Sequence, residues 1–550
     1  MILPTSKSRA VFWVLLTSFI VVWLYALGAR TLVPTDEGRY AEIAREMLAT
    51  GDWITIRLNG IKYFEKPPLQ SWMNAATFAL FGLGDWQARL WTGICGLIGV
   101  AAVGYTGRRV FGPAVGLNAA LVLGSSVLWA GLGHINTLDM GLSAMMALAL
   151  CGLLQAQRNH ASATEQRNGM LLCWAGMALA VMSKGLIGVV LPGAVLTLYV
   201  LIARDWSVLK RLHPVKGLAL FFAITVPWFV LVSLRNPEFA QFFFIHEHFD
   251  RFTSKSHHRA GPLYYFLPIL LLGIIPWLGL LGHSVAQTAR DETNGFQPRL
   301  LLLIWCGFIF LFFSVSSSKL PSYILPIFPA LALLIGCSLA EINARMLRIN
   351  AAILVVLGLA GLVFLPRVPG LSHQAFEQPL YAAYLPWIGA AAIIAMLGGV
   401  AAFALAQRAR QRSIVVTAAT GFLLLQALMI GHEPLGRYAA GIDYVAAINA
   451  AMTPQTRLYT VNHYEQALPF YLRRTSTLVG QADEMAFGLQ QQPELWLPDI
   501  EVFIQRWQTA EPAIAVLAPD TYLQLKNRQL AMHVIASDPR RVIVANQLRP

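Results

Sequence analysis

Charged residues are scarce in this sequence. Asp, Glu, Lys and Arg make up 13% of the 550 residues, whereas hydrophobic residues make up 56% and the mean hydropathy is +0.57. A soluble protein of ordinary composition carries about 25% charged residues. The composition therefore excludes an ordinary soluble enzyme. It predicts a chain that crosses a membrane many times, because each helical span needs about 20 apolar residues.

Cysteine is also scarce, and every cysteine lies inside an apolar run, where a thiol behaves as a small hydrophobic group. The five are Cys95, Cys151, Cys173, Cys306 and Cys337. Their spacing matches neither a zinc site nor a disulfide framework. We therefore expect any external domain to fold without disulfide bonds.

Two nucleotide signatures are missing from the sequence, the Gly-x-x-x-x-Gly-Lys phosphate loop and a dinucleotide-binding glycine pattern. Their absence argues against transport driven by nucleotide hydrolysis. The net charge of +13 raises the possibility of nucleic-acid binding. The basic residues lie mostly in short loops between apolar runs, however, which favours anionic lipids as partners and no nucleic acid.

The apolar runs and the charges between them predict a topology of about thirteen spans with a cytoplasmic N-terminus. The first run, about residues 10–28, follows Lys7 and Arg9 and lacks a small-residue cleavage site, so we expect a retained anchor. Basic clusters then recur in alternate loops. The opposite segments are expected outside: residues 30–86, 134–139, 235–262, 316–322 and 367–380, the turn near Lys184, and the chain beyond His432.

The composition becomes polar after about Gly431. Short β-rich runs appear at residues 458–461, 513–518 and 542–546, and a helical segment at 500–507 lies between them. This pattern predicts a transmembrane catalytic domain over residues 1–431 and a small periplasmic α/β domain over residues 432–550.

The first outer loop holds the densest polar sequence of the N-terminal half, from Thr35 to Met47. Apolar Ile43 and Met47 alternate with polar residues at helical spacing, which predicts an amphipathic helix on the membrane surface. Asp36 would lie at or near its N-terminus. From position alone, Asp36 is either a helix cap or a functional acid.

A glutamate and a lysine precede two prolines later in this loop, in Tyr63-Phe64-Glu65-Lys66-Pro67-Pro68. The prolines stiffen the backbone directly after this pair. Lys66 at the outer interface suits a lipid phosphate, as a compact point charge. The alternative is an interfacial lysine that only extends towards water.

Asp139 and Lys184 are isolated charges where spans end. A charge at membrane depth is costly, so such residues face a cavity or pair with another polar group. We favour a functional role for both. The structural alternative is an ion pair of Lys184 with Asp36 or Asp139.

Two further outer segments carry polar groups. His246, Glu247 and His248 could ligate a divalent metal. Their spacing is not the His-Glu-x-x-His of zinc proteases, and from the loop alone a hydrogen-bonded surface cluster is favoured. The second segment, residues 316–323, supplies Lys319 and Tyr323 at one outer boundary.

Acids, cations and tyrosines thus converge on the outer face, as expected for transfer between phosphorylated lipids. The cations would hold a leaving phosphate, while the acids would orient an acceptor or bind a polar sugar. Nucleotide sugars are not available outside the cytoplasm. A sugar donor carried on a lipid phosphate is therefore expected.

Several segments together resemble one family, the bacterial 4-amino-4-deoxy-L-arabinose lipid A transferases of the GT-C class, relatives of the protein O-mannosyltransferases. They cover roughly the first three-quarters of the chain and read Asp36-Glu37-Gly38-Arg39-Tyr40, Glu65-Lys66-Pro67-Pro68, Ser183-Lys184-Gly185, Glu247-His248-Phe249-Asp250-Arg251-Phe252 and Lys319-Leu320-Pro321-Ser322-Tyr323. The resemblance implies a mainly α GT-C transmembrane bundle with an external domain. It also implies an inverting enzyme that gives resistance to polymyxin and cationic antimicrobial peptides.

The resemblance also implies site residues. The family's acids correspond to Asp36 and Asp139, and its carrier-phosphate site to Lys66 and Lys184, with Arg39 added. Candidates for the substrate pocket are Tyr40, Tyr63, Lys319 and Tyr323. A divalent metal, Zn or Mg/Mn, would be held by Glu65, His246 and His248, although no cofactor is required with certainty.

The implied partners are undecaprenyl-phosphate-linked aminoarabinose, lipid A and membrane lipids, and we expect a monomer in the bacterial inner membrane. Besides a non-catalytic receptor that binds a partner through the external domain, two alternatives stay open. One is another GT-C transferase that moves a different sugar from a polyprenyl phosphate to a protein or glycan. The other is a lipid transporter, against which stand the absence of a sequence repeat and the gathering of polar clusters at one face.

Overall fold

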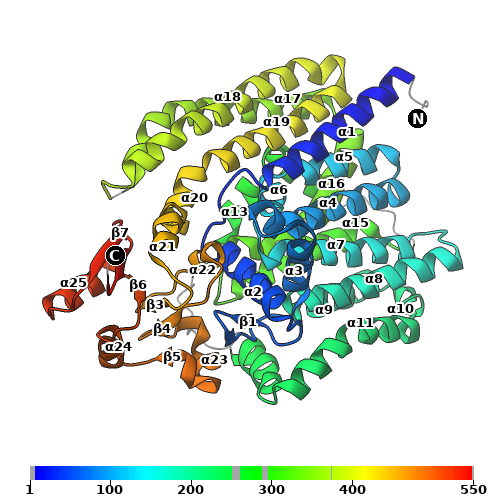
Figure 1. Cartoon of the computed structure of the whole chain (residues 1–550). Helices are drawn as coiled ribbons and strands as arrows, with labels where there is room; N and C mark the ends of the chain where they lie inside the picture. Colours follow the sequence, from blue (N-terminus) through cyan, green and yellow to red (C-terminus); the bar gives the residue numbers. More distant parts are fainter. Residues whose placement is uncertain (1–5, 251–260, 288–294, 373, 548–550) are drawn as a thin grey trace. The chain divides into compact units, whose positions relative to one another are not determined.

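The computed structural model describes residues 6–250, 261–287, 295–372 and 374–547, and most of its elements are helices (Figure 1). The chain divides into two compact units. Unit 1 comprises the chain up to Leu27, Arg89–Leu371 and Tyr384–Gly431. Unit 2 comprises Gly28–Ala88, Ser372–Ala383 and the chain from His432 onwards. Unit 2 thus combines the first predicted outer loop with the C-terminal segment.

Unit 1 is helical, and two of its helices, α4 and α18, begin a few residues before its boundaries. Its elements are α1 (Ser6–Ala26), α4 (Asp85–Val110), α5 (Pro113–Ser125), α6 (Val127–Leu132), α7 (Leu138–Gln157), α8 (Ala163–Lys184), α9 (Ile187–Ala203), α10 (Ser207–Lys210), α11 (Pro214–Arg235), η1 (Gln241–Asp250), α13 (Phe266–Gly273), η2 (Leu278–Leu280), α14 (Leu281–Gln287), α15 (Pro298–Val315), η4 (Pro321–Ile327), α16 (Phe328–Glu341), α17 (Ala344–Phe364), η5 (Leu365–Leu371), α18 (Gln378–Arg408) and α19 (Arg410–Gly431).

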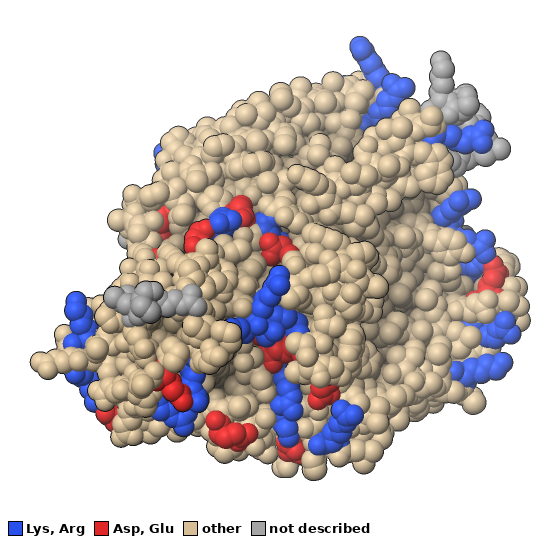
Figure 2. All heavy atoms as spheres, viewed as in Figure 1, with Lys and Arg blue, Asp and Glu red and all other residues tan. Residues whose placement is uncertain are grey.

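The described residues contain nine helices that are long and apolar enough to cross a membrane, or ten if the pair bent by 110° at residues 273–278 is one span. A multi-pass membrane protein is therefore confirmed. Three other helices fall short, since α5 has 13 residues, α9 has 17, and the 22-residue α8 begins with a polar turn and ends at Lys184. The count of about thirteen spans stays a prediction. Figure 2 shows broad uncharged areas over α17–α19, as expected for helices that face lipid.

Helices α7 and α8 pack closely through small residues. A Cβ added at Gly176 of α8 would lie 2.6 Å from the backbone nitrogen of Ala149 on α7, and one at Gly152 of α7 would lie 2.5 Å from the carbonyl oxygen of Gly169. Small residues let helix backbones approach in this way within membranes. The close packing places the first turn of α7 beside the last turn of α8.

Unit 2 contains a six-stranded sheet (Figure 1, orange to red). Its strands, β3 (Arg457–Val461), β4 (Thr477–Val479), β5 (Trp496–Leu497), β6 (Ala513–Leu517), β7 (His533–Ser537) and β8 (Val542–Ala545), lie in the order β5-β4-β3-β6-β8-β7. The first four strands in that order are parallel, and β8 is antiparallel to both β6 and β7. In the register, Tyr459 lies opposite both Thr477 and Ala515.

Helices cover both faces of the sheet, which confirms the predicted α/β character. One face packs against α24 (Ile500–Trp507) and α25 (Pro519–Asn527), the other against α21 (Val445–Ala451) and α22 (Leu468–Leu472). The remaining short elements of the C-terminal segment are α20 (Glu433–Ala440), η6 (Ile442–Tyr444), η7 (Asp483–Met485), α23 (Ala486–Gln491) and η8 (Pro493–Leu495).

The predicted helix after Asp36 is present as α2 (Asp36–Thr50), and the hairpin β1 (Arg57–Leu58) and β2 (Ile61–Lys62) and helix α3 (Leu69–Phe81) follow it. Every residue of α2 from Glu37 to Met47 is buried, including its charged ones. The C-terminal segment supplies part of this cover, because a Cβ at Gly38 would lie 2.5 Å from the Cα of Ala467. The polar side of α2 therefore faces protein.

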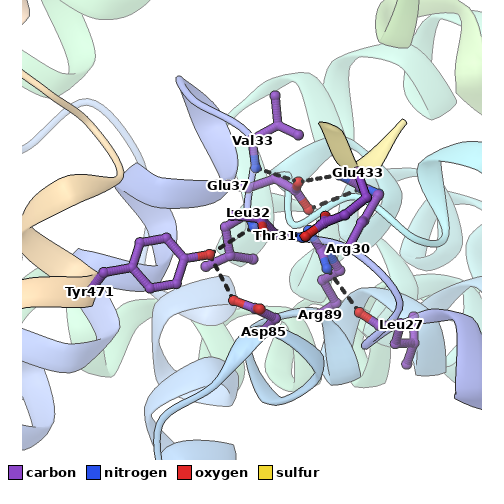
Figure 3. Close-up of polar contacts among 10 residues, drawn as sticks. All are labelled: Leu27, Arg30, Thr31, Leu32, Val33, Glu37, Asp85, Arg89, Glu433 and Tyr471. Carbon is purple, nitrogen blue, oxygen red and sulfur yellow. Dashed lines mark hydrogen bonds and ion pairs between the residues drawn. The ribbon is translucent and has the colours of Figure 1, made fainter. Parts of the chain in front are cut away.

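Figure 3 shows how the chain leading into α2 is held. The backbone N–H of Thr31 donates to Glu433 at 2.6 Å, and the N–H of Leu32 donates to the Tyr471 hydroxyl at 2.8 Å. Glu37, in the first turn of α2, accepts from the Arg30 guanidinium at 2.8 Å and from the N–H of Val33 at 2.9 Å. These bonds fix the segment that carries Asp36.

Candidate active site

Asp36 lies in the first turn of α2, and Arg39 follows one turn later. The helix begins at Asp36 itself, and the preceding Thr35 makes no side-chain cap. The Asp36 carboxylate lies 3.6 Å from the Arg39 guanidinium and is 39% exposed, whereas the Arg39 side chain is 8% exposed. Asp36 is thus the accessible member of the pair, beside a buried cation.

Both predicted tyrosines of this loop lie beside Arg39. The guanidinium donates to the Tyr63 hydroxyl at 3.4 Å and lies 5.9 Å from the centre of the Tyr40 ring. Burial raises the pKa of Tyr63 well above its ordinary value, and the charge of Glu65 adds to this effect. Tyr63 is therefore a neutral phenol over the physiological pH range.

Two further residues complete this cluster, and sequence reasoning missed both. Glu484 pairs with Arg39 at 2.9 Å, and Gln466 donates to the other oxygen of the Glu484 carboxylate at 2.6 Å. Burial raises the pKa of Glu484 above its ordinary value. More than 400 residues separate Glu484 from Arg39 in the sequence. No local spacing signals such a contact.

Lys66 and Glu65 are neighbours in space as well as in sequence. The Lys66 ammonium donates to the carbonyl oxygen of Glu65 at 2.8 Å and lies 3.8 Å from its carboxylate. Both side chains are partly buried, in the turn that leads through two prolines into α3. The predicted stiff presentation of Lys66 agrees with this turn.

A second cluster lies within unit 1, where α7, α8 and η4 meet. Asp139, in the first turn of α7, forms an ion pair with Lys184, the last residue of α8. The other Asp139 oxygen accepts from the Ser322 hydroxyl at 2.9 Å, and the Lys184 ammonium lies 4.7 Å from the centre of the Tyr323 ring. Of the two ion-pair partners considered for Lys184, the structure shows Asp139.

Lys319 is held by other groups. Its ammonium donates to the carbonyl oxygen of Ser314 at 2.5 Å and lies 5.7 Å from the centre of the Phe266 ring. Burial lowers the pKa of Lys319. Its contacts are thus separate from the group around Asp139.

The predicted metal ligands are tested only in part. The side chains of His246 and His248 lie outside the described residues, although the backbone of η1 around them is described. Glu65 is described and lies beside Lys66. Within the described part of the chain, no three His, Cys, Asp or Glu residues form a group suited to a metal ion. The metal site therefore stays a prediction.

The two clusters share one chemical character. Each joins a carboxylate, a cation and a tyrosine, and each cation has a protein carboxylate as its counterion. A phosphate can replace or supplement such a counterion, because guanidinium and ammonium groups bind phosphate oxygens as they bind carboxylates. The arrangement suits the binding of a phosphorylated substrate and the stabilisation of a departing phosphate.

Comparison with known proteins finds two matching family models. One, described as the aminoarabinose transferase C-terminal domain, matches residues 444–546. The other, described as dolichyl-phosphate-mannose-protein mannosyltransferase, matches residues 65–231. The two models cover parts of the C-terminal sheet domain and of the N-terminal half.

Named relatives match larger parts of the chain. An undecaprenyl phosphate-alpha-4-amino-4-deoxy-L-arabinose arabinosyl transferase of Edwardsiella ictaluri is 33% identical over 360 residues, which are 65% of this chain and 65% of that protein. A second transferase of that name, from Pseudomonas fluorescens, is 30% identical over 500 residues, which are 88% of this chain and 80% of that protein.

Solved structures match the whole chain. The crystal structure of ArnT from Cupriavidus metallidurans bound to undecaprenyl phosphate is 42% identical, with a TM-score of 0.94 over 99% of both chains. Its apo state gives 0.92 over 98% of both. The chain described here therefore belongs to the family of undecaprenyl phosphate-alpha-4-amino-4-deoxy-L-arabinose arabinosyl transferases, which are GT-C glycosyltransferases that use a lipid-linked sugar.

Proposed function

We propose that this protein transfers 4-amino-4-deoxy-L-arabinose from undecaprenyl phosphate to a phosphate of lipid A, with inversion at the anomeric carbon. The observation that carries this proposal is the match over 99% of both chains to an ArnT structure bound to undecaprenyl phosphate. The reaction takes place at the periplasmic face of the inner membrane. It masks negative charge on lipid A and so gives resistance to polymyxin and other cationic peptides.

The reaction is a displacement at the anomeric carbon. An oxygen of the lipid A phosphate attacks this carbon, and the bond from the carbon to the carrier phosphate oxygen breaks. The electron pair of that bond leaves with undecaprenyl phosphate. A phosphate monoester has a second pKa of about 6, so the attacking oxygen is already ionised at neutral pH. The protein therefore supplies orientation and charge stabilisation, and no general base is required.

Arg39 and Lys66 of unit 2 are assigned to the carrier phosphate. Arg39 is buried and held by Glu484, so its orientation is preorganised before substrate binds. Lys66 is held beside Glu65 and the two prolines. As the carbon–oxygen bond breaks, negative charge grows on the carrier phosphate, and fixed cations stabilise that charge more than they stabilise the bound donor.

The two acids take different roles in this proposal. Asp36 is partly exposed, so its carboxylate is available to hold the ammonium group of the sugar and to orient the acceptor. Asp139 is 9% exposed and is engaged by Lys184 and Ser322, which suits a positioning residue that fixes Lys184 for a phosphate. Tyr40, Tyr63, Lys319 and Tyr323 stay candidates for the substrate pocket.

A divalent metal held by Glu65, His246 and His248 also stays a proposal. The described ligand is a single carboxylate with a lysine nearby, so it fits a metal only together with both imidazoles. Metal analysis of the purified protein checks this, with Glu65→Gln as the comparison. Equal metal content in the two proteins would exclude Glu65 as a ligand.

The test of function is mass spectrometry of lipid A from cells that make the aminoarabinose carrier but lack their own transferase. With the intact gene we expect an added aminoarabinose mass. With Asp36→Asn we expect a loss of at least about a hundredfold in turnover, about 2.7 kcal/mol of transition-state stabilisation. The matched control is Asp443→Asn, an exposed acid of unit 2 paired with Arg437.

The outcomes separate the candidate functions. No added mass, with the protein present in the membrane, would contradict the proposed acceptor or sugar and favour another transferase of this class. Full activity of Asp36→Asn would show that the Asp36 carboxylate is not needed for the reaction. A transporter would move the labelled carrier lipid without releasing its sugar. If the purified protein releases sugar from this lipid, it is not only a transporter.

A further inference from the structure

The sheet of unit 2 has a feature that the transfer reaction does not use. Strand β3 lies between β4 and β6, so the chain leaves β3 in one direction along the sheet and later returns to its other side. Such a reversal among parallel strands opens a crevice beyond their carboxyl ends. In open α/β sheets this crevice is where ligands bind.

A cavity of about 480 Å³ lies at this edge, which is within the range of roughly 300–1,000 Å³ for small-molecule sites. Each residue that directly follows β3, β4 and β5 lines it, and so does one side of α25. The polar or backbone-exposing residues of the lining are Asn462, Gly480, Asp499, Thr521, Gln524 and Arg528.

The backbone at this edge is shaped to keep the cavity open. Gly480 has a φ of +78°, and a Cβ there would lie 2.0 Å from the side-chain oxygen of Asn462. The indole N–H of Trp496 donates to the carbonyl oxygen of Gly480 at 2.9 Å and fixes this turn. Only glycine combines this φ with so close an approach.

The lining has planar polar groups that are available to a ligand. Asn462 and Gln524 are exposed, and within the described residues their side-chain amides have no hydrogen-bond partner. An amide offers two donors and one acceptor oxygen. The charged residues of the lining are already engaged, since Asp499 accepts from the N–H of Glu501 at 2.9 Å and Arg528 pairs with the Glu501 carboxylate at 2.7 Å.

This chemistry disfavours a phosphate or a nucleotide. The residues after β3 are Asn462-His463-Tyr464-Glu465-Gln466 and contain no glycine-rich phosphate loop. Helix α24 is already capped by the Asp499 carboxylate at 2.9 Å, and α25 begins with Pro519 and an acid. The N-terminus of α24 is therefore occupied, and Asp520 in the first turn of α25 repels an anion there. Hydroxyl groups, which both donate and accept, match the two exposed side-chain amides better.

We propose that this edge of the sheet is a carbohydrate-binding cleft, and that it holds the glycan of the glycolipid acceptor. The part of the proposal that names the acceptor rests on the proposed function. A glycan held here supplies binding energy remote from the reacting phosphate. Such binding lowers KM for acceptors that carry the glycan and leaves acceptors without it unaffected.

The direct test uses the full-length protein in detergent and the water-soluble oligosaccharide released from lipopolysaccharide by mild acid. Saturation-transfer NMR should show its binding to the unchanged protein. The double variant Asn462→Gly, Gln524→Ala should raise Kd at least tenfold, while Gln508→Ala, an exposed glutamine outside the lining, should not. Glycine is chosen at Asn462 because that residue has a φ of +54°, which glycine adopts without strain.

The kinetic test compares two acceptors, lipid A alone and lipid A that carries further sugars. The double variant should raise KM about tenfold for the second acceptor and leave kcat and the first acceptor unchanged. Three results would contradict a carbohydrate-binding cleft. They are absence of oligosaccharide binding to the unchanged protein, equal effects of the double variant on both acceptors, and displacement of the oligosaccharide by inorganic phosphate. If no acceptor is modified at all, the proposed function fails, and the NMR result still decides whether the cleft binds carbohydrate.

Discussion

At the scale of single residues, Arg39 depends on a partner from a distant part of the chain. Its guanidinium is buried and lies 2.9 Å from the Glu484 carboxylate. Removing one member of a buried ion pair leaves an uncompensated charge, which costs about 3–5 kcal/mol when the pair is fully buried. Replacing both members by neutral groups is often nearly neutral for stability. Stability and catalysis therefore respond differently to changes at this pair.

We predict that Arg39→Gln and Glu484→Gln each lower stability by about 1–3 kcal/mol, less than for a fully buried pair because Glu484 is 22% exposed. The double variant should recover most of the loss. Activity should stay low in both proteins that lack Arg39. Thermal unfolding in detergent and sugar transfer, measured on the same samples, check this. Recovery of activity in the double variant would show that Arg39 is structural only.

Glu46 predicts a dependence of stability on pH. Burial raises the pKa of Glu46 to about 8 from an ordinary value of 4.5, and the nearby Glu42 adds to this shift. On α2 the group faces Glu42 and Arg45, and the C-terminal segment adds the Tyr464 phenol. The N–H groups of Asn59 and Gly60 donate to the Glu46 carboxylate at 2.5 and 2.7 Å.

The unfolded chain therefore releases this proton near pH 4.5, whereas the folded chain holds it until about pH 8. The unfolded state binds fewer protons than the folded state between these pH values. The contribution of Glu46 to the stability of the folded state is therefore full at low pH and falls as the pH rises. Glu46→Gln should remove that fall. The midpoint of thermal unfolding is compared between the two proteins at pH 5, 6.5 and 8, and the unchanged protein should lose stability relative to Glu46→Gln as the pH rises. A difference between the two midpoints that stays constant with pH would contradict the raised pKa of Glu46.

At this scale, contacts between residues that are close along the chain can be inferred from spacing. Asp36 and Arg39 are one helical turn apart, and Glu65 and Lys66 are adjacent, so their spacing alone indicates contact. Glu484 and Gln466 have no such signal. They contact Arg39 only because a distant part of the chain folds over α2. The periodicity of the sequence does not predict that contact.

At the scale of elements, the two charges of unit 1 depend on the packing of α7 against α8. Asp139 begins one helix and Lys184 ends the other, so their distance is set by how closely the helices approach. The helices approach closely at several glycines, among them Gly176. A side chain at such a position forces the helices apart, and overpacking costs about 1–3 kcal/mol or more.

We predict that Gly176→Val reduces the yield of folded protein and lowers the activity of what remains. Gly193→Val is the matched control, because Gly193 lies in α9 and, apart from its own helix backbone, the described residues place no atom within 4 Å of an added Cβ. Size-exclusion chromatography in detergent and sugar transfer measure the two effects. Equal behaviour of both variants would show that close packing of α7 and α8 is not needed.

The elements that sequence predicted are those with a strong local pattern. The predicted helix at 500–507 coincides with α24, and three β-rich runs correspond to β3, β6 and β8. Strands β4, β5 and β7 were not identified. The first two have only three and two residues, and β7 is largely exposed, so none of them has a long apolar or alternating run.

At the scale of the whole molecule, the proposed orientation rests on the basic residues between the helices. Cytoplasmic loops are enriched in Lys and Arg, which assigns the α7–α8 connection to the cytoplasm and the C-terminal domain to the periplasm. We predict that a membrane-impermeant maleimide labels Gln508→Cys in intact spheroplasts and labels Arg167→Cys only after lysis. Both positions are exposed.

The native thiols leave a low background for this measurement. Four of the five cysteines are buried, and Cys306 is partly buried within α15. The protein without an added cysteine is the control. The reverse labelling pattern would invert the whole assignment and place the transfer reaction on the cytoplasmic side.

Composition identified the polar C-terminal segment, but it does not show which other segments belong to the same compact unit. Hydropathy is a local property, and residues 28–88 are separated from the chain after His432 by most of the transmembrane helices. The grouping arises from contacts such as Gly38 against Ala467 and Asn59 against Ser476, which are visible only in three dimensions.

This discontinuity has a consequence for how the protein is made. The ribosome produces α2 more than 400 residues before the residues that cover it, among them Tyr464 and Ala467. Until those residues are made, the charged side chains of α2 lack the protein surface that buries them in the folded structure. Unit 2 is therefore completed only after these later residues have been made, and a nascent chain that stops at residue 431 cannot assemble it. Loss of even a modest C-terminal portion should expose the first loop to quality-control proteases while leaving the inserted helices in place.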